Sequence, residues 1–237
     1  MTNGTFIMID GIAGSGKTTV IQAMFKELVA RGLRCFRLQD WKETHPPRFE
    51  EIPDFDVYFT SEPTRQWIGA AIREEMSRVD QLYGGEELAH AFALDREIMY
   101  RRLIIPAKRA KKIIIQDRGF STSLAYQVAM PGALSFEAIG SLPGNILALV
   151  HAPDALILTT IPVQMAISRI SLRHDDNKGV FQDPVLLTKV ADNFKSKNFR
   201  ALFEESGTRI FDLDTSGTLE ESKTSAVSLI TQLLKNT

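Results

Sequence analysis

The chain has 237 residues, of which 44% are hydrophobic and 24% charged, and these proportions predict one soluble globular domain with a sizeable core. Its formal net charge of −1 argues against a sequence-independent nucleic-acid binder, which usually carries a basic surplus. A single cysteine, Cys35, excludes an internal disulfide and a cysteine-based metal site, and no stretch approaches the roughly 20 apolar residues that span a bilayer, so we expect a cytoplasmic protein without a nucleic-acid or membrane partner.

The first third of the chain predicts a strand, a loop and a helix, followed by two more strands. "TFIMI" is an apolar run of strand length, and behind the glycines of residues 11–16 the residues Val20, Met24 and Leu28 recur at helical spacing. "LRCFRLQ" and "DVYFTSEP" are the next predicted strands. Residues 41–55 between them hold three prolines and many charges, so we predict an exposed insertion there.

The rest of the chain alternates helices and strands. "KKIIIQDRG" is the clearest buried strand because three β-branched residues precede its polar end, and "ALILTTI" and "TRIFDLD" are further strands. Helices are predicted at 65–78, at 86–105 with an end or kink near Pro106, at 120–129, at 135–149, from Pro162, at about 184–205 and from about 218.

This alternation predicts an α/β fold with a parallel sheet covered on both faces, which binds ligands at the carboxyl ends of its strands. We predict a five-stranded parallel sheet flanked by helices, in a single domain that spans residues 1–237.

The motif that identifies the chemistry is "GIAGSGKT", which matches G-x-x-x-x-G-K-[ST] between a predicted strand and a predicted helix. Backbone amides and the helix N-terminus would hold the phosphates of ATP, Lys17 would neutralise the transferring phosphoryl group, and the Thr18 hydroxyl would bind Mg²⁺. A plain glycine-rich turn, or a loop that holds phosphate without catalysis, is the alternative. The predicted ATP-binding residues are Gly11, Ile12, Ala13, Gly14, Ser15, Gly16, Lys17, Thr18 and Thr19.

Two classes of P-loop protein do not fit. A Ras-type GTPase needs an N-K-x-D base reader, whereas "NKGV" has Val180 in place of the aspartate. A motor ATPase usually has a strand ending in D-E, whereas Asp117 is followed by Arg118. A small-molecule kinase with the P-loop NTPase fold remains, so we predict a single kinase domain over residues 1–237 with a short lid at about 173–184.

Four further stretches in order, "SEPTRQWIGAAIREEM", "FALDR", "DRGFSTSLAYQ" and "PDALILTTIPVQMAISRISLR", resemble the thymidylate kinase family together with the phosphate loop. The tail "FDLDTSGTLEE" is similar to the adenine-side loop of that family. The resemblance implies ATP and dTMP as substrates, Mg²⁺ as cofactor and a homodimer.

The acceptor side of the predicted site begins with Phe92 and Arg96, which lie four apart on one face of a predicted helix. A ring and a guanidinium placed in this way can stack on a base and donate to its carbonyl oxygen. The resemblance assigns these two roles to Phe92 and Arg96. It also implies that Ser123 bonds the N3 edge of the pyrimidine and that Tyr126 crowds the 2′ position. A core phenylalanine, an arginine paired with a carboxylate and a tyrosine that merely packs are the alternatives.

Charged residues at the ends of predicted elements complete the site. Arg118 follows the most clearly predicted strand directly and can bind the acceptor and transferring phosphates together. Asp117 at the end of that strand could hold Mg²⁺ through water. A salt bridge that caps the next helix is the alternative for this pair. Arg169 and Arg173 lie four apart, and an anionic ligand would relieve their repulsion, although cations near a helix C-terminus are also common. We expect Lys17, Arg118, Arg169 and Arg173 to be the catalytic residues.

The phosphate loop departs from the family pattern at Ala13, where many thymidylate kinases have a carboxylate that touches the sugar. We expect this contact either to come from elsewhere, with Asp10 as the candidate, or to be weaker. Glu62 is a further acceptor-side residue, and it supports a rival interpretation. In deoxynucleoside kinases a glutamate before proline acts as the base on a sugar hydroxyl, and "SEPTRQW" also resembles that pattern. A non-catalytic module that binds nucleotide is the third interpretation.

Overall fold

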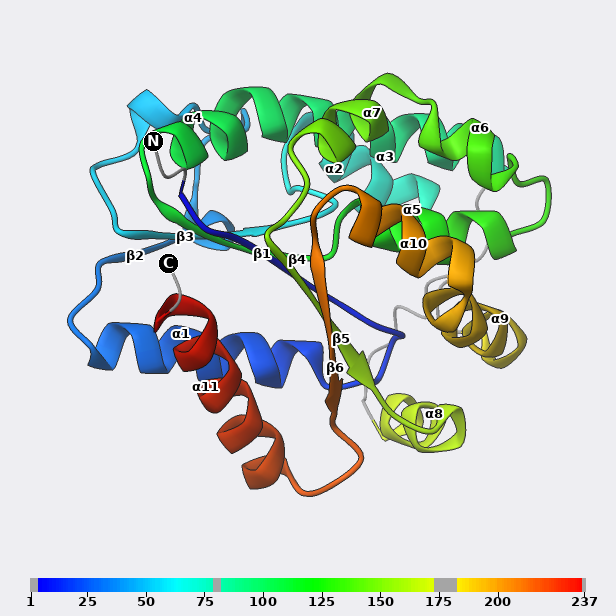
Figure 1. The fold of residues 1–237 in the computed structure, drawn as a ribbon. Helices are drawn as coiled ribbons and strands as arrows, with labels where there is room; N and C mark the ends of the chain where they lie inside the picture. Colours follow the sequence, from blue (N-terminus) through cyan, green and yellow to red (C-terminus); the bar gives the residue numbers. More distant parts are fainter. Residues whose placement is uncertain (1–3, 79–81, 173–182, 236–237) are drawn as a thin grey trace.

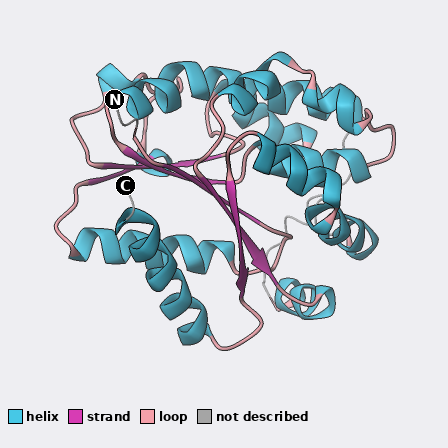
Figure 2. Ribbon diagram, viewed as in Figure 1, coloured by secondary structure: helices cyan, strands magenta, loops and turns pink. Residues whose placement is uncertain are grey.

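The computed structural model describes residues 4–78, 82–172 and 183–235. One mixed α/β unit surrounds a parallel sheet, in which the strands pair in the order β2-β3-β4-β1-β5-β6 (Figures 1 and 2). The strands are β1 (Phe6–Asp10), β2 (Cys35–Arg37), β3 (Val57–Ser61), β4 (Ile113–Asp117), β5 (Ala155–Thr160) and β6 (Arg209–Asp214).

The sheet has six strands, so the predicted number of five was wrong. Each strand-like segment of the sequence finds a partner. Even the three-residue β2 pairs along β3, with Cys35 opposite Val57. The predicted fold class, a parallel sheet flanked by helices, is confirmed.

Eleven α-helices connect or cover the strands in the described part of the chain. They are α1 (Lys17–Ala30), α2 (Trp67–Ala71), α3 (Gly85–Met99), α4 (Ile105–Arg109), α5 (Phe120–Tyr126), α6 (Phe136–Gly140), α7 (Pro143–Val150), α8 (Val163–Ser171), α9 (Pro184–Lys195), α10 (Lys197–Glu205) and α11 (Leu219–Lys235). Among residues 4–78, 82–172 and 183–235, none of the helices has the length and apolar character needed to cross a membrane.

Proline and serine residues divide two of the predicted helices. The segment predicted at 135–149 forms α6 and α7, because Pro143 begins a new helix instead of continuing the old one. Ser196 ends α9 and caps α10 by accepting from the amide of Phe199. At Pro106 the helical run continues to Arg109, with a π-helical turn immediately before α4.

Alternating side chains of β1 belong to two hydrophobic cores, one on each face of the sheet. Ile7 and Ile9 pack with α1 and α11, whereas Phe6 and Met8 belong to the larger core beneath the remaining helices. Figure 1 shows α1 and α11 on one side and α3, α4, α5, α7 and α10 on the other. Central strands that are mainly apolar and buried on both faces are typical of parallel sheets.

The segment 41–55 differs in part from the predicted exposed insertion. Its charged side chains face outward, but Ile52 is only 6% exposed and belongs to the larger core. Trp41 and Phe49 pack against the same core, and Arg102 of the helical run after α3 donates from Nε to the carbonyl oxygen of Pro46 at 2.7 Å. The segment is therefore docked on the domain.

The carboxyl ends of the strands meet at one edge. Asp117 at the end of β4 lies opposite both Ile9 in β1 and Ser61 in β3, and Thr160 in β5 lies opposite Asp214 in β6. Side chains that follow these strands are thereby brought together, as expected for a ligand site in a parallel sheet.

Candidate active site

The loop between β1 and α1 depends on its glycines. Gly14 and Gly16 have φ of 78° and 85°, a left-handed conformation that side chains rarely adopt. A Cβ atom at Gly14 would lie 2.5 Å from the carbonyl oxygen of Ala166 in α8, so a larger residue would push α8 away. The loop leads directly into the N-terminus of α1, an arrangement that suits a bound phosphate.

Lys17, the first residue of α1, folds back over this loop. Its Nζ donates to the carbonyl oxygens of Gly11 and Ile12, at 2.8 Å each, and only 7% of the residue is exposed. Thr18 follows and is exposed. The ammonium therefore lies at the loop, beside the amides that would hold a polyphosphate.

Hydroxyl groups attach the loop to the ends of β5 and β6. Ser15 Oγ lies 2.6 Å from Thr159 Oγ1, and Thr215 Oγ1 donates to the carbonyl oxygen of Ser15 at 2.7 Å. Arg169 in α8 donates from Nη2 to the carbonyl oxygen of Thr215 at 2.9 Å. Arg169 is thereby held between the phosphate loop and the turn before α11, the turn that the sequence compares with an adenine-side loop.

The predicted lid falls mainly outside the described residues. Arg173 and residues 173–182 are not described, whereas Asp183 caps α9 by accepting from the amide of Leu186 at 2.8 Å. The lid and the role of Arg173 remain predictions.

Asp10 is completely buried and bonded to protein groups on both carboxylate oxygens. Oδ1 accepts from the amide of Gly11 at 2.8 Å, and Oδ2 accepts from the hydroxyls of Ser121 and Thr122, both at 2.6 Å. Arg118 Nη1 lies 3.5 Å from Oδ1. In this structure Asp10 ties the phosphate loop to the beginning of α5, and the sugar contact expected of it remains a prediction.

Arg118 and Tyr126 lie next to each other beneath the loop. Arg118 has a φ of 65° at the turn after β4, and its guanidinium carbon lies 5.7 Å from the centroid of the Tyr126 ring. The Tyr126 hydroxyl accepts from the amide of Ala13 at 2.8 Å, and burial raises the pKa of this phenol. Tyr126 thus supports the phosphate loop as a neutral phenol, and its effect on the 2′ position remains a prediction.

Asp117 has the features expected of a cation ligand. Its Oδ1 is buried and has no hydrogen-bond partner among the described residues. Burial raises its pKa, against the opposing effect of the Arg118 and Lys17 charges. No group of three or more histidine, cysteine, aspartate or glutamate residues in the described part of the chain could hold a metal by itself. Asp117 and the exposed Thr18 fit an ion whose remaining ligands come from nucleotide phosphates and water.

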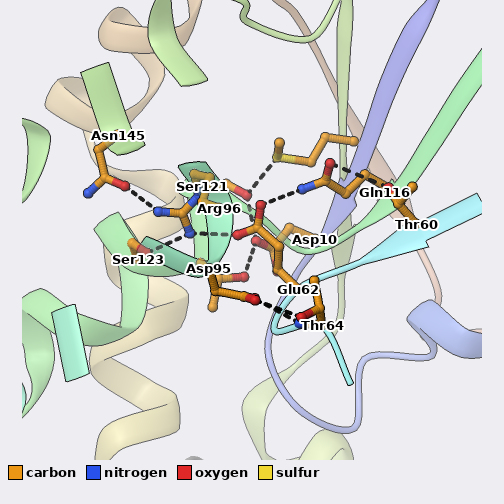
Figure 3. A network of polar contacts seen from close by, with 12 residues as sticks. Asp10, Thr60, Glu62, Thr64, Asp95, Arg96, Gln116, Ser121, Ser123 and Asn145 are labelled. Carbon is orange, nitrogen blue, oxygen red and sulfur yellow. Dashed lines mark hydrogen bonds and ion pairs between the residues drawn. The ribbon is translucent and has the colours of Figure 1, made fainter. Parts of the chain in front are cut away.

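A second cluster, the acceptor clamp, surrounds Arg96 in α3 (Figure 3). Arg96 is fully buried, and its Nη2 lies 2.7 Å from Glu62 Oε2 and 2.9 Å from Ser123 Oγ. Its Nη1 donates to Asn145 Oδ1 in α7. We define the acceptor clamp as Glu62, Arg96, Ser123 and Asn145. It joins the loop after β3 to α3, α5 and α7.

The loop after β3 is locked in place around this clamp. Gln116 donates from Nε2 to Glu62 Oε1 at 2.8 Å, and Asp95 accepts from both the amide and the hydroxyl of Thr64, at 2.8 and 2.6 Å. Burial raises the pKa of Glu62 to about 7, because desolvation and the nearby Asp95 outweigh the attraction of Arg96.

Phe92 lies one helical turn before Arg96. It is 6% exposed and packs with Ile72, Leu88 and Met130 in a small cluster apart from the two cores of the sheet. Arg96 pairs with the Glu62 carboxylate. The alternative to base recognition, a core phenylalanine and an arginine paired with a carboxylate, therefore also fits the structure. The stacking role of Phe92 remains a prediction.

Three buried polar atoms in or next to the acceptor clamp lack a hydrogen-bond partner among the described residues, and one of them, Glu62 Oε2, has only its ion pair with Arg96. Arg96 Nε has no hydrogen-bond partner among the described residues, and neither has Oε1 of Gln127, which follows Ser123 by one helical turn. Leaving such groups unbonded costs free energy. The structure thus leaves one donor, Arg96 Nε, and two acceptors, Gln127 Oε1 and the ion-paired Glu62 Oε2, without a hydrogen bond in this part of the site.

Sequence reasoning did not find Asn145, Gln116 or Gln127 as site residues. Asn145 had a visible signal, because it is the one polar side chain in the helical stretch "PGNILALV". Gln116 had only its position beside Asp117, whereas Gln127 ends the stretch "DRGFSTSLAYQ", whose resemblance to the family was a signal for it. Asn145 bonds to Arg96 and Gln116 bonds to Glu62, partners in distant segments that no local pattern reveals.

Together these groups can hold two anionic ligands against each other. The phosphate loop and Lys17 suit a polyphosphate tail, and the acceptor clamp suits the polar edge of a base. Arg118 leaves β4 between the two. This arrangement can support transfer of a phosphoryl group by positioning and charge stabilisation.

Comparison with known proteins finds thymidylate kinases, both as a family model and as individual relatives. The model of the thymidylate kinase family matches residues 48–226, a range that begins after the phosphate loop. A thymidylate kinase from Desulfotalea psychrophila is 30% identical to this chain over 196 residues, which cover 83% of each chain. A probable thymidylate kinase from Pyrococcus abyssi is 34% identical over 72% of this chain and 71% of its own length. A thymidylate kinase from Ruthia magnifica subsp. Calyptogena magnifica is 28% identical over 99% of this chain and 100% of its own, so that match includes the loop.

Proposed function

The chain belongs to the thymidylate kinase family, and on this premise we propose that it transfers the γ-phosphoryl group of ATP to dTMP, giving dTDP and ADP. The observation that supports this acceptor best is the pair of open buried groups, Arg96 Nε and Gln127 Oε1. Thymine offers a carbonyl oxygen beside an N–H group, so it can satisfy a donor and an acceptor together. Cytosine presents an amino group where thymine has that oxygen.

In this mechanism the residues of the chain act by position and charge. The loop amides and Lys17 hold the β- and γ-phosphates of ATP, and Arg118 draws the acceptor phosphate toward them. Arg169, together with Arg173 from the predicted lid, supplies further positive charge at the transferring group. Thr18 and Asp117 would hold Mg²⁺, which neutralises phosphate charge when it is bound.

The environment of Glu62 disfavours the nucleoside kinase interpretation. A base for a sugar hydroxyl needs a free carboxylate oxygen at the reacting atom. Instead, Glu62 Oε1 accepts a hydrogen bond from Gln116, and Oε2 is ion-paired with Arg96 Nη2 at 2.7 Å, although without a hydrogen bond. A phosphate acceptor is already an anion and needs no such base, which fits a monophosphate kinase.

A coupled assay of ADP release tests the proposal with dTMP, dUMP, dCMP and thymidine as separate acceptors. We expect dTMP to be the preferred acceptor. A response to thymidine alone would instead favour the nucleoside kinase, and silence with all four acceptors would favour a non-catalytic module.

Lys17→Ala tests the assigned role of the phosphate loop in the same assay. Removing the ammonium takes away charge stabilisation on the phosphates, so we expect turnover to fall by about a thousandfold or more with the fold intact. Lys26→Ala is a matched control, because Lys26 is an exposed lysine on the same helix. Full activity of Lys17→Ala would contradict the assignment.

The setting of the enzyme is also part of the proposal. We infer a cytoplasmic protein with ATP and dTMP as its small-molecule partners. The family resemblance suggests a homodimer, and an exposed apolar surface on α3 and α7 supports that assembly.

A further inference from the structure

The first turn of α7 approaches α3 more closely than most residues would permit. A Cβ atom at Gly144 would fall on the carbonyl oxygen of Ala93 in α3, so glycine is required there. Pro143 begins the helix, a position where its missing N–H group is not needed. This close contact places the next residue, Asn145, against the guanidinium of Arg96.

Asn145 is an unusual residue for its surroundings. It is fully buried in a helix whose other residues, apart from Pro143 and Gly144, are apolar, and a buried amide costs free energy unless it is hydrogen-bonded. Both ends of the side chain are bonded. Oδ1 accepts from Arg96 Nη1, and Nδ2 donates to the carbonyl oxygen of Ile139 in α6 at 2.6 Å. Ile139 thus anchors the amide that meets Arg96.

The partners of Arg96 come from different directions, as Figure 3 shows. Glu62 and Ser123 both contact Nη2, and Asn145 contacts Nη1. A planar guanidinium held at both terminal nitrogens has one rotation left that satisfies all its partners. In that rotation Nε is the buried nitrogen without a protein partner.

We infer that Asn145 is a positioning residue of the acceptor site, which sets the rotation of the Arg96 guanidinium and so determines where its open N–H group meets the base. This inference rests on the proposed function. Without the Asn145 oxygen, the carboxylates of Glu62 and Asp95 would be the strongest remaining attractions on Arg96. The guanidinium would turn toward them, and the base would lose its donor, while the phosphate loop would be unchanged.

The test compares two substitutions that both remove the bond to Ile139. Asn145→Leu is similar in size and removes the acceptor for Arg96 as well, whereas Asn145→Asp retains an oxygen that can accept from Nη1. Steady-state kinetics are measured with dTMP and ATP varied separately, and with dCMP as a competing acceptor. Loss of a hydrogen bond from a charged donor predicts a rise of about tenfold or more in the KM for dTMP of Asn145→Leu.

The remaining readouts separate positioning from a purely structural effect. We expect the KM for ATP and kcat of Asn145→Leu to change by less than about threefold, and Asn145→Asp to keep a KM for dTMP within about threefold of the wild type. The preference for dTMP over dCMP should fall only in Asn145→Leu. Asn193→Ala is a control, because Asn193 also donates from Nδ2 to a helix carbonyl oxygen, that of Ala125 at 2.8 Å, without touching Arg96.

Three outcomes would overturn the inference: equal values of KM for dTMP in the two Asn145 variants, equal rises for ATP and dTMP, or a rise of the same size in Asn193→Ala. For a variant without measurable turnover, the dTMP-induced shift in Tm replaces KM, and equal shifts in both Asn145 variants would overturn the inference too. The wild type in the same assay tests the proposed function separately. A wild type that uses dTMP, together with an unaffected Asn145→Leu, refutes the positioning role alone.

Discussion

Glu62 and Arg96 form an ion pair that is cut off from water, with 2% and 0% of their side chains exposed. Taking two charges out of water is costly, and a buried pair returns that cost only when its hydrogen bonds are complete. Here they are incomplete, because Arg96 Nε is open and burial raises the pKa of Glu62 to about 7. We therefore interpret the pair as a feature kept for ligand binding at a cost in stability.

A pH-dependent stability follows from Glu62. Its pKa is higher in the folded protein than the ordinary value of 4.5, so between about pH 4.5 and 7 the folded state binds more protons than the unfolded state. The contribution of Glu62 to the free energy of unfolding therefore falls as the pH rises through this window. Urea unfolding at pH 5 and pH 7.5 should show a drop on the order of 2 kcal/mol in the wild type that is absent in Glu62→Gln.

Glu51→Gln provides the contrast for that measurement. The amide of Arg48 holds the pKa of Glu51 below its usual range, so Glu51 titrates below the window. The change in the free energy of unfolding of Glu51→Gln between pH 5 and pH 7.5 should then match that of the wild type. If Glu62→Gln showed the same change in the free energy of unfolding between pH 5 and pH 7.5 as the wild type, the pKa of Glu62 would not be raised in the folded protein.

Among the elements, the segment 41–55 shows how a polar stretch can belong to a fold. Its apolar residues are spread among charges and prolines, so no helical or strand period is visible. In the structure Ile52 is buried, and Arg102 bonds to Pro46 while its guanidinium carbon lies 5.4 Å from the centroid of the Trp67 ring. Trp67 begins α2, directly after the loop that carries Glu62. The segment is therefore linked, through Arg102, to the element that follows the acceptor loop.

Ile52→Ala should reveal whether this segment contributes to the core. Removing a buried isoleucine side chain costs the free energy of transfer and leaves a cavity, so we expect a loss of about 2–4 kcal/mol in the free energy of unfolding. Thr44→Ala, at an exposed position of the same segment, should change it by less than about 0.5 kcal/mol. Similar small effects of both substitutions would indicate that the segment is not docked in solution.

On the scale of the whole molecule, the ligand site at the strand ends differs from an exposed apolar surface on α3 and α7. The strand ends carry the site, while α3 and α7 lie together on one side of the sheet (Figure 1). Leu94 in α3 and Ile146 and Val150 in α7 are 46%, 49% and 70% exposed, although each is apolar. Neighbouring exposed apolar residues on two packed helices are the kind of surface that symmetric oligomers bury.

Size-exclusion chromatography with light scattering tests the proposed homodimer. We expect a mass of twice 26.5 kDa for the wild type, and a shift to the monomer when Ile146→Asp and Val150→Asp are combined, because a dimer would then bury charges. Val29→Asp, on α1, tests a similarly exposed apolar residue elsewhere and should leave the dimer intact. A monomeric wild type at micromolar concentration would contradict the proposal.

By itself the sequence determined the order of helices and strands and the phosphate loop. Residues 11–18 are adjacent in the chain, and the loop conformation depends mainly on their own glycines and on the helix that follows, so local chemistry suffices. The face shared by Phe92 and Arg96 was predictable for the same reason. Only the tertiary structure decided the number of paired strands, the docking of segment 41–55 and the partners of Arg96. Arg96 and Asn145 are separated by 49 residues, and they meet because Gly144 lets two helices touch, a contact that depends on packing and leaves no periodic pattern in the sequence.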